Sequence, residues 1–232
     1  MHWADVVALN LSRRGNKHIV STGITPSGEF HIGHLREILT GDMIARAATD
    51  SGLDVDFIFI VDDADPLRRV YPFLDEEYAK FIGHQIGDIP APKADGKPDY
   101  QSYESTGWNY ADHFLNPFLD ALSTIGVRPR IVKNLASYKS GKFTECAKIA
   151  CDNSDKIKEI IERVSSRELP DNWFPWSPLN SNGSLEGVSV TGYEFPLVHY
   201  TDADGNTGSS DLTKGEGKLP WRIAVSYTHL TL

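Results

Sequence analysis

The sequence predicts an α/β protein with a parallel sheet and an insertion that is first helical and then β-rich. Two observations predict the sheet. Short β-branched runs alternate with helical patterns over the first 135 residues, and strand, helix and strand follow at the spacing of βαβ units. A third predicts the insertion, because residues 171–217 are rich in Gly, Ser, Asn, Asp and aromatic residues. We accordingly divide the chain into residues 1–136, 137–217 and 218–232.

The first part contains the strands of the sheet and their connecting helices. The β-branched runs predict strands, and apolar residues at helical spacing predict the helices between them. The turn Thr25-Pro26-Ser27-Gly28 ends the first strand, because Pro fixes φ and Gly tolerates a tight bend. We expect strands at 18–24, 56–61 and 130–132, and helices at about 32–52, 75–84 and 106–125.

The insertion begins with one or two helices over residues 142–166. Its later part contains the dipeptides Asn182-Gly183 and Asp204-Gly205, which are typical of hairpin turns between short alternating runs. We therefore expect a small antiparallel module after the helices. The apolar stripe expected on the helices consists of Ile149, Ile157, Ile160, Ile161 and Val164.

Composition indicates a soluble globular protein without a membrane span. The chain has 232 residues, of which 40% are hydrophobic and 24% charged, and a net charge of −9. No apolar run approaches the roughly 20 residues that cross a bilayer, and the N-terminal residues lack the basic and apolar regions of a signal peptide, so we expect a cytoplasmic protein. Two cysteines, Cys146 and Cys151, exclude a disulfide framework and a four-thiolate zinc site. The acidity argues against a general nucleic-acid coat.

The segment from Pro26 to His34 lies where the first strand gives way to the first helix. Ligands of open α/β sheets bind at the carboxyl ends of the strands, and a helix N-terminus attracts phosphate. His31 and His34 are three residues apart, so they share one helical face and can both donate to one phosphate. Gly33 removes a side chain between them and leaves space for a flat ring or for close approach of a ligand to the backbone.

His31-Ile32-Gly33-His34 resembles the signature of class I aminoacyl-tRNA synthetases. The run from Thr22 to Gly28, followed by His34-Leu35-Arg36-Glu37, resembles more particularly the class I lysyl-tRNA synthetase of archaea and some bacteria. The resemblance covers about residues 1–223. Three further segments agree with it, namely 61–70, 137–142 and 217–222.

The resemblance implies a Rossmann-like catalytic domain that activates lysine with ATP and transfers it to tRNA(Lys) with loss of AMP. It also implies that Mg²⁺ accompanies the nucleotide. His31 and His34 would stabilise the charge that develops on the α-phosphate. Gly23 and Thr25 would line the amino-acid pocket. The expected ATP-binding residues are Pro26, Ser27, Gly28, His31, Ile32, Gly33 and His34.

An acidic cluster follows the second strand, and the ammonium of lysine needs an anionic partner once it is desolvated. Asp62, Asp63 and Asp65 are the candidates for this role, and of these we predict Asp63 and Asp65 as substrate-binding residues. Two alternatives remain open. The cluster is a solvated turn that pairs with Arg68 and Arg69, or Asp62 or Asp63 helps to hold the ribose or the histidine side.

A basic stretch in this acidic chain is the candidate for the tRNA backbone, since phosphate contacts supply sequence-independent affinity. The alternative is a solvated, salt-bridged face. Residues 193–200 contain no cysteine, so we expect no zinc there. The candidate tRNA-binding residues are Arg128, Arg130, Lys133, Lys139 and Lys142, with Lys148 nearby and Glu145 as the one acidic residue among them.

The chain departs from the family pattern at its end. The lysine-serine loop that forms the second class I signature is absent, and residues 224–232 match nothing that the family has there. We therefore expect an N-terminal fragment that is inactive alone and ends in a foreign tail. The alternatives are a class I synthetase for Glu or Arg, a non-catalytic nucleotide- or tRNA-binding module and, more weakly, another nucleotidyltransferase.

Overall fold

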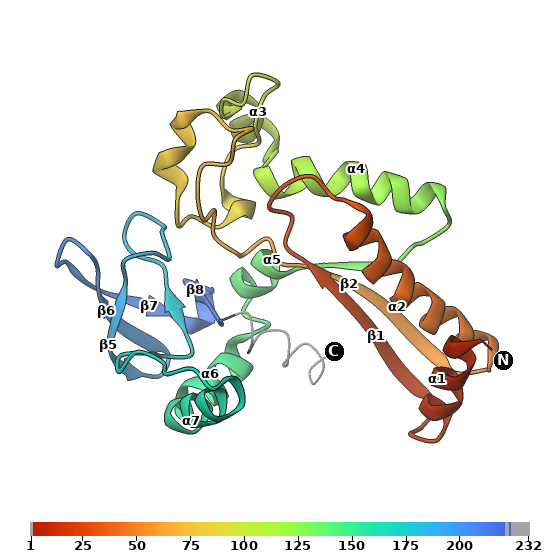
Figure 1. Ribbon diagram of the computed structural model, residues 1–232. Coiled ribbons are helices and arrows are strands. Elements are labelled where there is room, and N and C mark those ends of the chain that lie inside the picture. Colours follow the sequence, from red (N-terminus) through yellow and green to blue (C-terminus); the bar gives the residue numbers. More distant parts are fainter. Residues whose placement is uncertain (1, 221–222, 224–232) are drawn as a thin grey trace.

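A three-stranded parallel sheet forms the centre of the first part of the molecule (Figure 1). The computed structural model describes residues 2–220 and 223. The strands β1 (Lys17–Ile24), β2 (Asp54–Val61) and β3 (Arg130–Lys133) lie in the order β1-β2-β3, and both neighbouring pairs are parallel. The predicted α/β class and the three predicted strands are confirmed, so the carboxyl ends of all three meet at one edge.

Two helices cover the same face of this sheet, α2 (Ile32–Asp50) and α4 (Tyr110–Thr124). Ile38 of α2 and Phe118 of α4 share one buried cluster with Phe59 and Val61 of β2. Gly41 permits the close approach of α2, because a Cβ there would lie 2.6 Å from the Thr22 side chain. A further helix, α1 (Trp3–Ser12), packs against α2 and was not expected from the sequence.

The chain between β2 and α4 is mostly irregular. The helix predicted at 75–84 is present as a shorter 3₁₀ helix, η1 (Glu76–Phe81). The chain leaves the helix because Gly83 and His84 exchange backbone hydrogen bonds with Leu67. The helix predicted to begin at 106 begins at Tyr110, because Gly107 takes a φ of 73° and ends the preceding helix. This segment contains η1, η2 (Ile86–Asp88) and α3 (Tyr100–Thr106).

Two helices fall within the predicted range 142–166 and short antiparallel strands follow them, as predicted, while a further short helix that was not predicted lies before them (Figure 1). The β6–β7 hairpin turns at Asp204-Gly205, which is confirmed. The prediction of a hairpin at Asn182-Gly183 is wrong, because no two paired strands flank this turn among the described residues. Ser184, just after the turn, instead forms an isolated antiparallel β-bridge with His84 of the first part. The elements are α5 (Asn134–Lys139), α6 (Thr144–Asp152), α7 (Ser154–Ser165), β4 (Ser177–Pro178), β5 (Ser189–Glu194), β6 (Leu197–Thr201), β7 (Thr207–Asp211), η3 (Leu212–Lys214) and β8 (Gly217–Lys218).

The apolar stripe predicted on α6 and α7 is buried only in part. Ile157 packs against the core of the later part, whereas Ile149 is 44% and Val164 77% exposed. The division of the chain at residues 136 and 217 stays a prediction. Of residues 218–232 the structure describes 218–220 and 223, so the expectation of a foreign tail lies outside the described residues.

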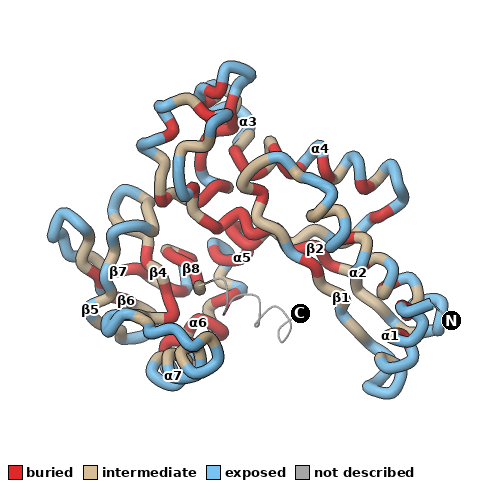
Figure 2. Tube along the Cα trace, in the orientation of Figure 1, coloured by how far each residue is buried: buried red, intermediate tan, exposed pale blue. Residues whose placement is uncertain are grey.

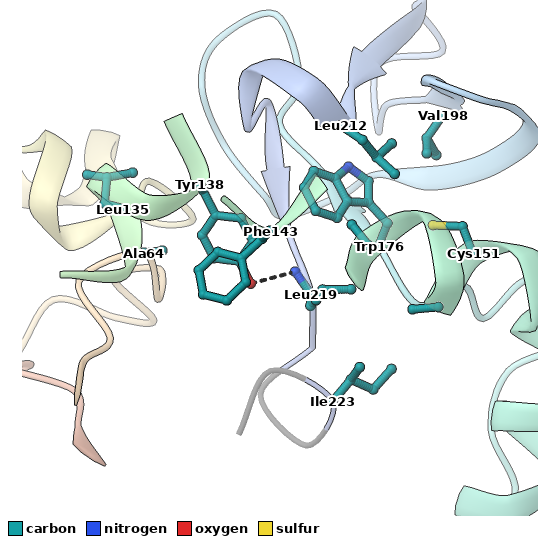
Figure 3. Close-up of a cluster of buried hydrophobic side chains, with 12 residues drawn as sticks. Ala64, Leu135, Tyr138, Phe143, Cys151, Trp176, Val198, Leu212, Leu219 and Ile223 are labelled. Atoms are coloured by element: carbon teal, nitrogen blue, oxygen red, sulfur yellow. Dashed lines mark hydrogen bonds between the residues drawn. The ribbon is translucent and has the colours of Figure 1, made fainter. Parts of the chain in front are cut away.

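One buried cluster joins the two parts (Figure 3). It contains Ala64 from the segment after β2, Tyr138 from α5, Trp176 and Leu219. The backbone N–H of Leu219 donates to the Tyr138 hydroxyl at 3.1 Å. Figure 2 shows the buried residues concentrated where β2 meets α5. The chain therefore returns from the insertion to the carboxyl edge of the parallel sheet.

Candidate functional site

The two signature histidines cap the helix that they begin. His31 is the N-cap of α2, and its Nδ1 accepts a hydrogen bond from the Gly33 N–H at 3.0 Å. The Nδ1 of His34 accepts from the His31 N–H, also at 3.0 Å. The ring centroids lie 3.9 Å apart. An Nδ1 that accepts carries no proton, so each neutral ring holds its proton on Nε2 and keeps that N–H as a donor for a ligand.

Gly33 is required by this arrangement. A Cβ at position 33 would lie 2.8 Å from Cε1 and 2.9 Å from Nδ1 of His31. The His31 imidazole therefore occupies the space that a side chain at position 33 would need. Ile32, between the two, is 78% exposed. The signature thus presents an exposed apolar side chain and two imidazole edges at the helix start.

The electrostatic surroundings favour a neutral His34. Burial lowers the pKa of His34 from its ordinary value of 6.5, the nearby His31 lowers it further, and Glu37 opposes both. At pH 7 the ring is therefore neutral and donates through Nε2. A neutral donor of this kind stabilises developing negative charge without losing a proton.

The turn before the histidines is held by α4. The Tyr110 hydroxyl donates to the Ser27 carbonyl oxygen at 2.7 Å. Phe30 stacks on Phe118 with centroids 4.2 Å apart and meets His34 edge-on at 5.1 Å. The predicted phosphate-binding turn is thus fixed on both sides of Gly28. Neither aromatic anchor on α4 was identified from the sequence, because apolar residues on a helix give no signal for what they hold.

Two predicted pocket residues at the end of β1 have carboxylate neighbours. The Gly23 N–H donates to Oε1 of Glu37 at 3.3 Å, and the Thr25 hydroxyl donates to Oδ2 of Asp65 at 3.4 Å. Glu37 lies on α2 and Asp65 lies just after β2. The amino-acid pocket proposed from the resemblance is therefore flanked by two acidic side chains.

The acidic cluster after β2 is buried around a lysine from the far end of the chain. Lys218 of β8 is 4% exposed, and its Nζ donates to Asp62 at 3.2 Å and to Asp65. Arg68 adds a second cation to Asp65 at 3.2 Å. Asn134 donates to Asp62 at 3.1 Å. The alternative that these aspartates form a solvated turn is therefore wrong, because they are buried. The pairing with Arg68 that this alternative included is observed.

Asp63 has a different environment from its neighbours. Its Oδ1 accepts from the Leu135 N–H at 2.7 Å, which caps the start of α5. Burial raises the pKa of Asp63 to about 6, against the opposing effects of that hydrogen bond and of Lys133. Asp65 already has two cations and Asp63 a backbone donor. The binding of a substrate ammonium by Asp63 and Asp65 stays a prediction.

The candidate tRNA-binding residues are partly neutralised. Arg130 pairs with Asp56, Lys133 with Asp112 and Lys139 with Asp88, each at 2.5 Å. Arg128 and Lys142 are exposed, and neither has a carboxylate partner among the described residues. The salt-bridged face is thus observed for three of the five positions, and contact with tRNA stays a prediction for all of them.

Within residues 2–220 and 223, no three His, Cys, Asp or Glu side chains lie together as a metal site would require. No helix in that same part of the chain has the length and apolar character to cross a membrane. Cys146 and Cys151 are both buried in α6, and burial raises the pKa of the Cys151 thiol to about 12, which keeps it protonated. The expected absence of zinc stays a prediction.

Two residues of the site were missed by sequence reasoning in their actual roles. Lys218 lies in segment 217–222, which resembles the family, but nothing in the sequence links it to aspartates about 155 residues earlier. Glu37 lies in the run His34-Leu35-Arg36-Glu37, which also resembles the family. Its contact with Gly23 could not be predicted, because it depends on how α2 packs on β1. A charged residue inside an apolar return segment was the available signal for Lys218.

Comparison with known proteins agrees with these features. The profile of the family described as "tRNA synthetases class I (K)" matches residues 1–227. The lysine–tRNA ligase of Methanosarcina barkeri (strain Fusaro) is 42% identical over 226 residues, and that of Thermoplasma acidophilum is 39% identical over 224. The Methanocaldococcus jannaschii lysine–tRNA ligase is 37% identical over 228 residues.

These alignments cover 96% of this chain but only 40–41% of each relative. The chain therefore spans about two fifths of the length of the curated relatives that it matches. Within that span the signature turn, the capped histidines and the buried return segment all lie in the matched region. The chain belongs to the family of class I tRNA synthetases (K).

Proposed function

We propose that the protein activates lysine with ATP to lysyl-adenylate and transfers the lysine to tRNA(Lys). The single observation that carries this proposal is the pair of imidazoles fixed at the start of α2 beside the end of β1. Membership of the family and relatives that are lysine–tRNA ligases support the substrate. We place the reaction in the cytoplasm.

The histidines act on the α-phosphate of ATP. As the lysine carboxylate attacks, negative charge develops on the phosphate oxygens and pyrophosphate leaves. The Nε2–H groups of His31 and His34 donate to those oxygens, and both rings are held in the required tautomer by their Nδ1 caps. Neither histidine becomes a nucleophile, and Mg²⁺ enters with the triphosphate as part of the substrate.

The turn from Pro26 to Gly28 receives the nucleotide. It is anchored through the Ser27 carbonyl by Tyr110, so its backbone does not have to be ordered when ATP binds. Ile32 and Gly33 present the exposed first turn of α2 to the same ligand. Gly23 and Thr25 line the amino-acid pocket at the end of β1, with Asp63 and Asp65 behind it.

For tRNA we propose the basic stretch after α4. The described ion pairs make Arg128 and Lys142 the strongest contributors, since their charges are not offset by a neighbouring carboxylate. The other three candidates would have to break their ion pairs with aspartates before they could bind phosphate. They are Arg130, Lys133 and Lys139. Replacing a contributor weakens tRNA binding at low salt and reduces its salt dependence.

The test is ATP–pyrophosphate exchange by the complete product of the gene that encodes this chain, with each of the amino acids in turn. We expect exchange with lysine, and about 10²- to 10³-fold slower exchange in His34→Ala. The matched control is His18→Ala, because His18 lies at the opposite end of β1 and bonds to the Gly15 carbonyl.

Other outcomes would replace the proposal. Exchange driven by glutamate or arginine identifies a synthetase for that amino acid. ATP or tRNA binding without exchange identifies a non-catalytic module. We expect the 232-residue chain alone to show no exchange, because the lysine-serine loop of the family is not in its sequence, and a normal rate from that chain would contradict this expectation.

A further inference from the structure

A cavity of about 360 Å³ lies outside the residues that the proposed function uses. It is lined by three segments that are distant in the sequence, namely α7 with the loop after it, the segment after β2, and the return segment at Pro220. Cavities that bind small molecules usually measure roughly 300–1,000 Å³. This cavity therefore has room for a ligand about the size of one substituted ring.

The loop after α7 forms a fixed wall of the cavity. The Leu169 N–H donates to Oε1 of Glu162 at 2.8 Å, and the Nζ of Lys158 donates to the Pro170 carbonyl oxygen at 2.9 Å. Both bonds tie the loop back to α7. Because Leu169 lines the cavity, this side of it is already shaped before a ligand enters, which lowers the entropic cost of binding.

The charged side chains of the lining are both arginines, Arg68 and Arg167, and no Asp or Glu of the described part of the chain lines the cavity. Arg167 forms no ion pair with any residue of 2–220 and 223. Arg68 pairs with Asp65, but its side chain is 69% exposed, so giving up this partner costs little. Asp65 would still keep Lys218. The cavity therefore favours an anion.

Ser165, in the last turn of α7, supplies a buried hydroxyl to the same lining. Its Oγ forms no hydrogen bond with any residue that the structure describes. A serine in a helix commonly bonds to the carbonyl oxygen four residues earlier, and Ser165 does not. Since a buried hydroxyl without a partner is unfavourable, an oxygen of a bound ligand would stabilise this group.

The apolar part of the lining suits an aromatic ring. Trp173 is half-buried and packs against the cluster that joins the two parts of the molecule, and Ile161 of α7 lies on the same lining. An indole offers a flat surface on which another ring can stack. The two guanidinium groups favour a doubly charged head group, and a phosphate monoester carries nearly two charges at pH 7.

We propose that this cavity binds a small aromatic phosphate monoester. The phosphate lies between Arg68 and Arg167 and accepts charge-assisted hydrogen bonds from both. The ring rests against Trp173 and Ile161, and the Ser165 hydroxyl bonds to an oxygen of the ligand. None of the lining residues belongs to the signature segment, so this site is distinct from the proposed ATP site.

Calorimetric titration of the complete gene product with phenyl phosphate tests the proposal. We expect the affinity to fall about 10- to 100-fold in Arg167→Gln, because the variant removes a charge-assisted contact with the phosphate. Arg167 is exposed, so the substitution leaves the fold intact. Inorganic phosphate lacks the ring and is expected to bind about 10-fold more weakly than phenyl phosphate, or weaker still.

Arg163→Gln is the matched control, since Arg163 is an exposed arginine of the same helix and does not line the cavity. It leaves the affinity for phenyl phosphate unchanged. An equal loss in Arg163→Gln would overturn the proposal, because it would indicate general attraction of anions to α7. Binding that His34→Ala abolishes and Arg167→Gln retains would place the ligand in the proposed ATP site and overturn it too. Equal affinities for phenyl phosphate and inorganic phosphate, or no binding of phenyl phosphate, would do the same.

Discussion

The signature segment, residues 26–34, and the acidic segment, residues 62–65, both follow a strand of the parallel sheet, yet they have opposite characters. The signature keeps exposed groups, and each histidine ring accepts a backbone hydrogen bond at Nδ1. The acidic segment is buried, and two of its three aspartates are bound to Lys218. The comparison teaches that a polar group at a strand end is available to ligands only if the rest of the fold has not already paired it.

The largest effect is expected for Lys218→Met, which removes the cation that the buried acidic segment shares. The substitution leaves Asp62 and Asp65 buried without their shared cation, and removing one partner of a buried ion pair costs about 3–5 kcal/mol. We expect the free energy of unfolding to fall by that amount in urea denaturation. Lys214→Met is the control, since the Lys214 side chain is 67% exposed although it pairs with Asp211, and its removal changes stability by about 0.5 kcal/mol or less.

A second test separates two neighbouring aspartates. Asp62→Asn weakens the bond to Lys218 and is expected to destabilise the protein by roughly 1–3 kcal/mol. Asp63→Asn keeps an oxygen for the Leu135 N–H but removes a buried charge that has no ion-pair partner among residues 2–220 and 223. We expect it to stabilise the protein at pH 7 by about 1–3 kcal/mol. Chemical denaturation should show a lower unfolding free energy for Asp62→Asn and a higher one for Asp63→Asn. Changes of the same sign would contradict the different environments assigned to the two aspartates.

The pH dependence of stability follows from the raised pKa of Asp63. The ordinary value is 3.8 and the folded value about 6, so between these limits the folded state binds more protons than the unfolded state. The contribution of Asp63 to stability is therefore present below about pH 4 and lost as the pH rises through 6. The difference in unfolding free energy between wild type and Asp63→Asn should grow over this interval. A constant difference would contradict the raised pKa.

The smallest test concerns the signature. His31→Asn keeps a good N-cap side chain but removes the imidazole whose charge lowers the pKa of His34. We expect the pKa of His34, measured by NMR titration, to rise in this variant and to remain below 6.5, because burial is the larger cause. Glu37→Gln should shift it in the other direction. A His34 pKa at or above 6.5 in wild-type protein would contradict the burial of the ring.

Much of the fold was predictable because local patterns determine it. The β-branched runs gave the three strands to within two residues at each end, and Asp204-Gly205 gave its hairpin. The helix α1 was missed because its buried face consists of Ala4 and Ala8, which make a weak apolar stripe. The helix predicted at 75–84 ends earlier, as a 3₁₀ helix at 76–81, because the backbone pairing with Leu67 that decides its end is not a local property.

The site was predictable where its residues lie close in sequence. His31, Gly33 and His34 interact with one another, and their spacing alone indicates a shared helical face. Lys218 and its aspartates are brought together only by the return of the chain through β8, so the sequence offered the aspartates as free ligands. The same reason explains the basic stretch, where Asp56, Asp88 and Asp112 pair with cations that sequence counting had left unopposed.

The buried cluster around Trp176 and Tyr138 has a consequence for how the molecule unfolds. Its members come from the segment after β2, from α5, from the antiparallel module and from the return segment, so neither part can lose its structure and leave this cluster intact. The 1% exposed indole of Trp176 donates to Ser210 at 2.9 Å and reports on that shared interior. Denaturation followed by tryptophan emission and by far-ultraviolet circular dichroism should therefore give coincident transitions. The first and the later part of the molecule then unfold as a single cooperative unit.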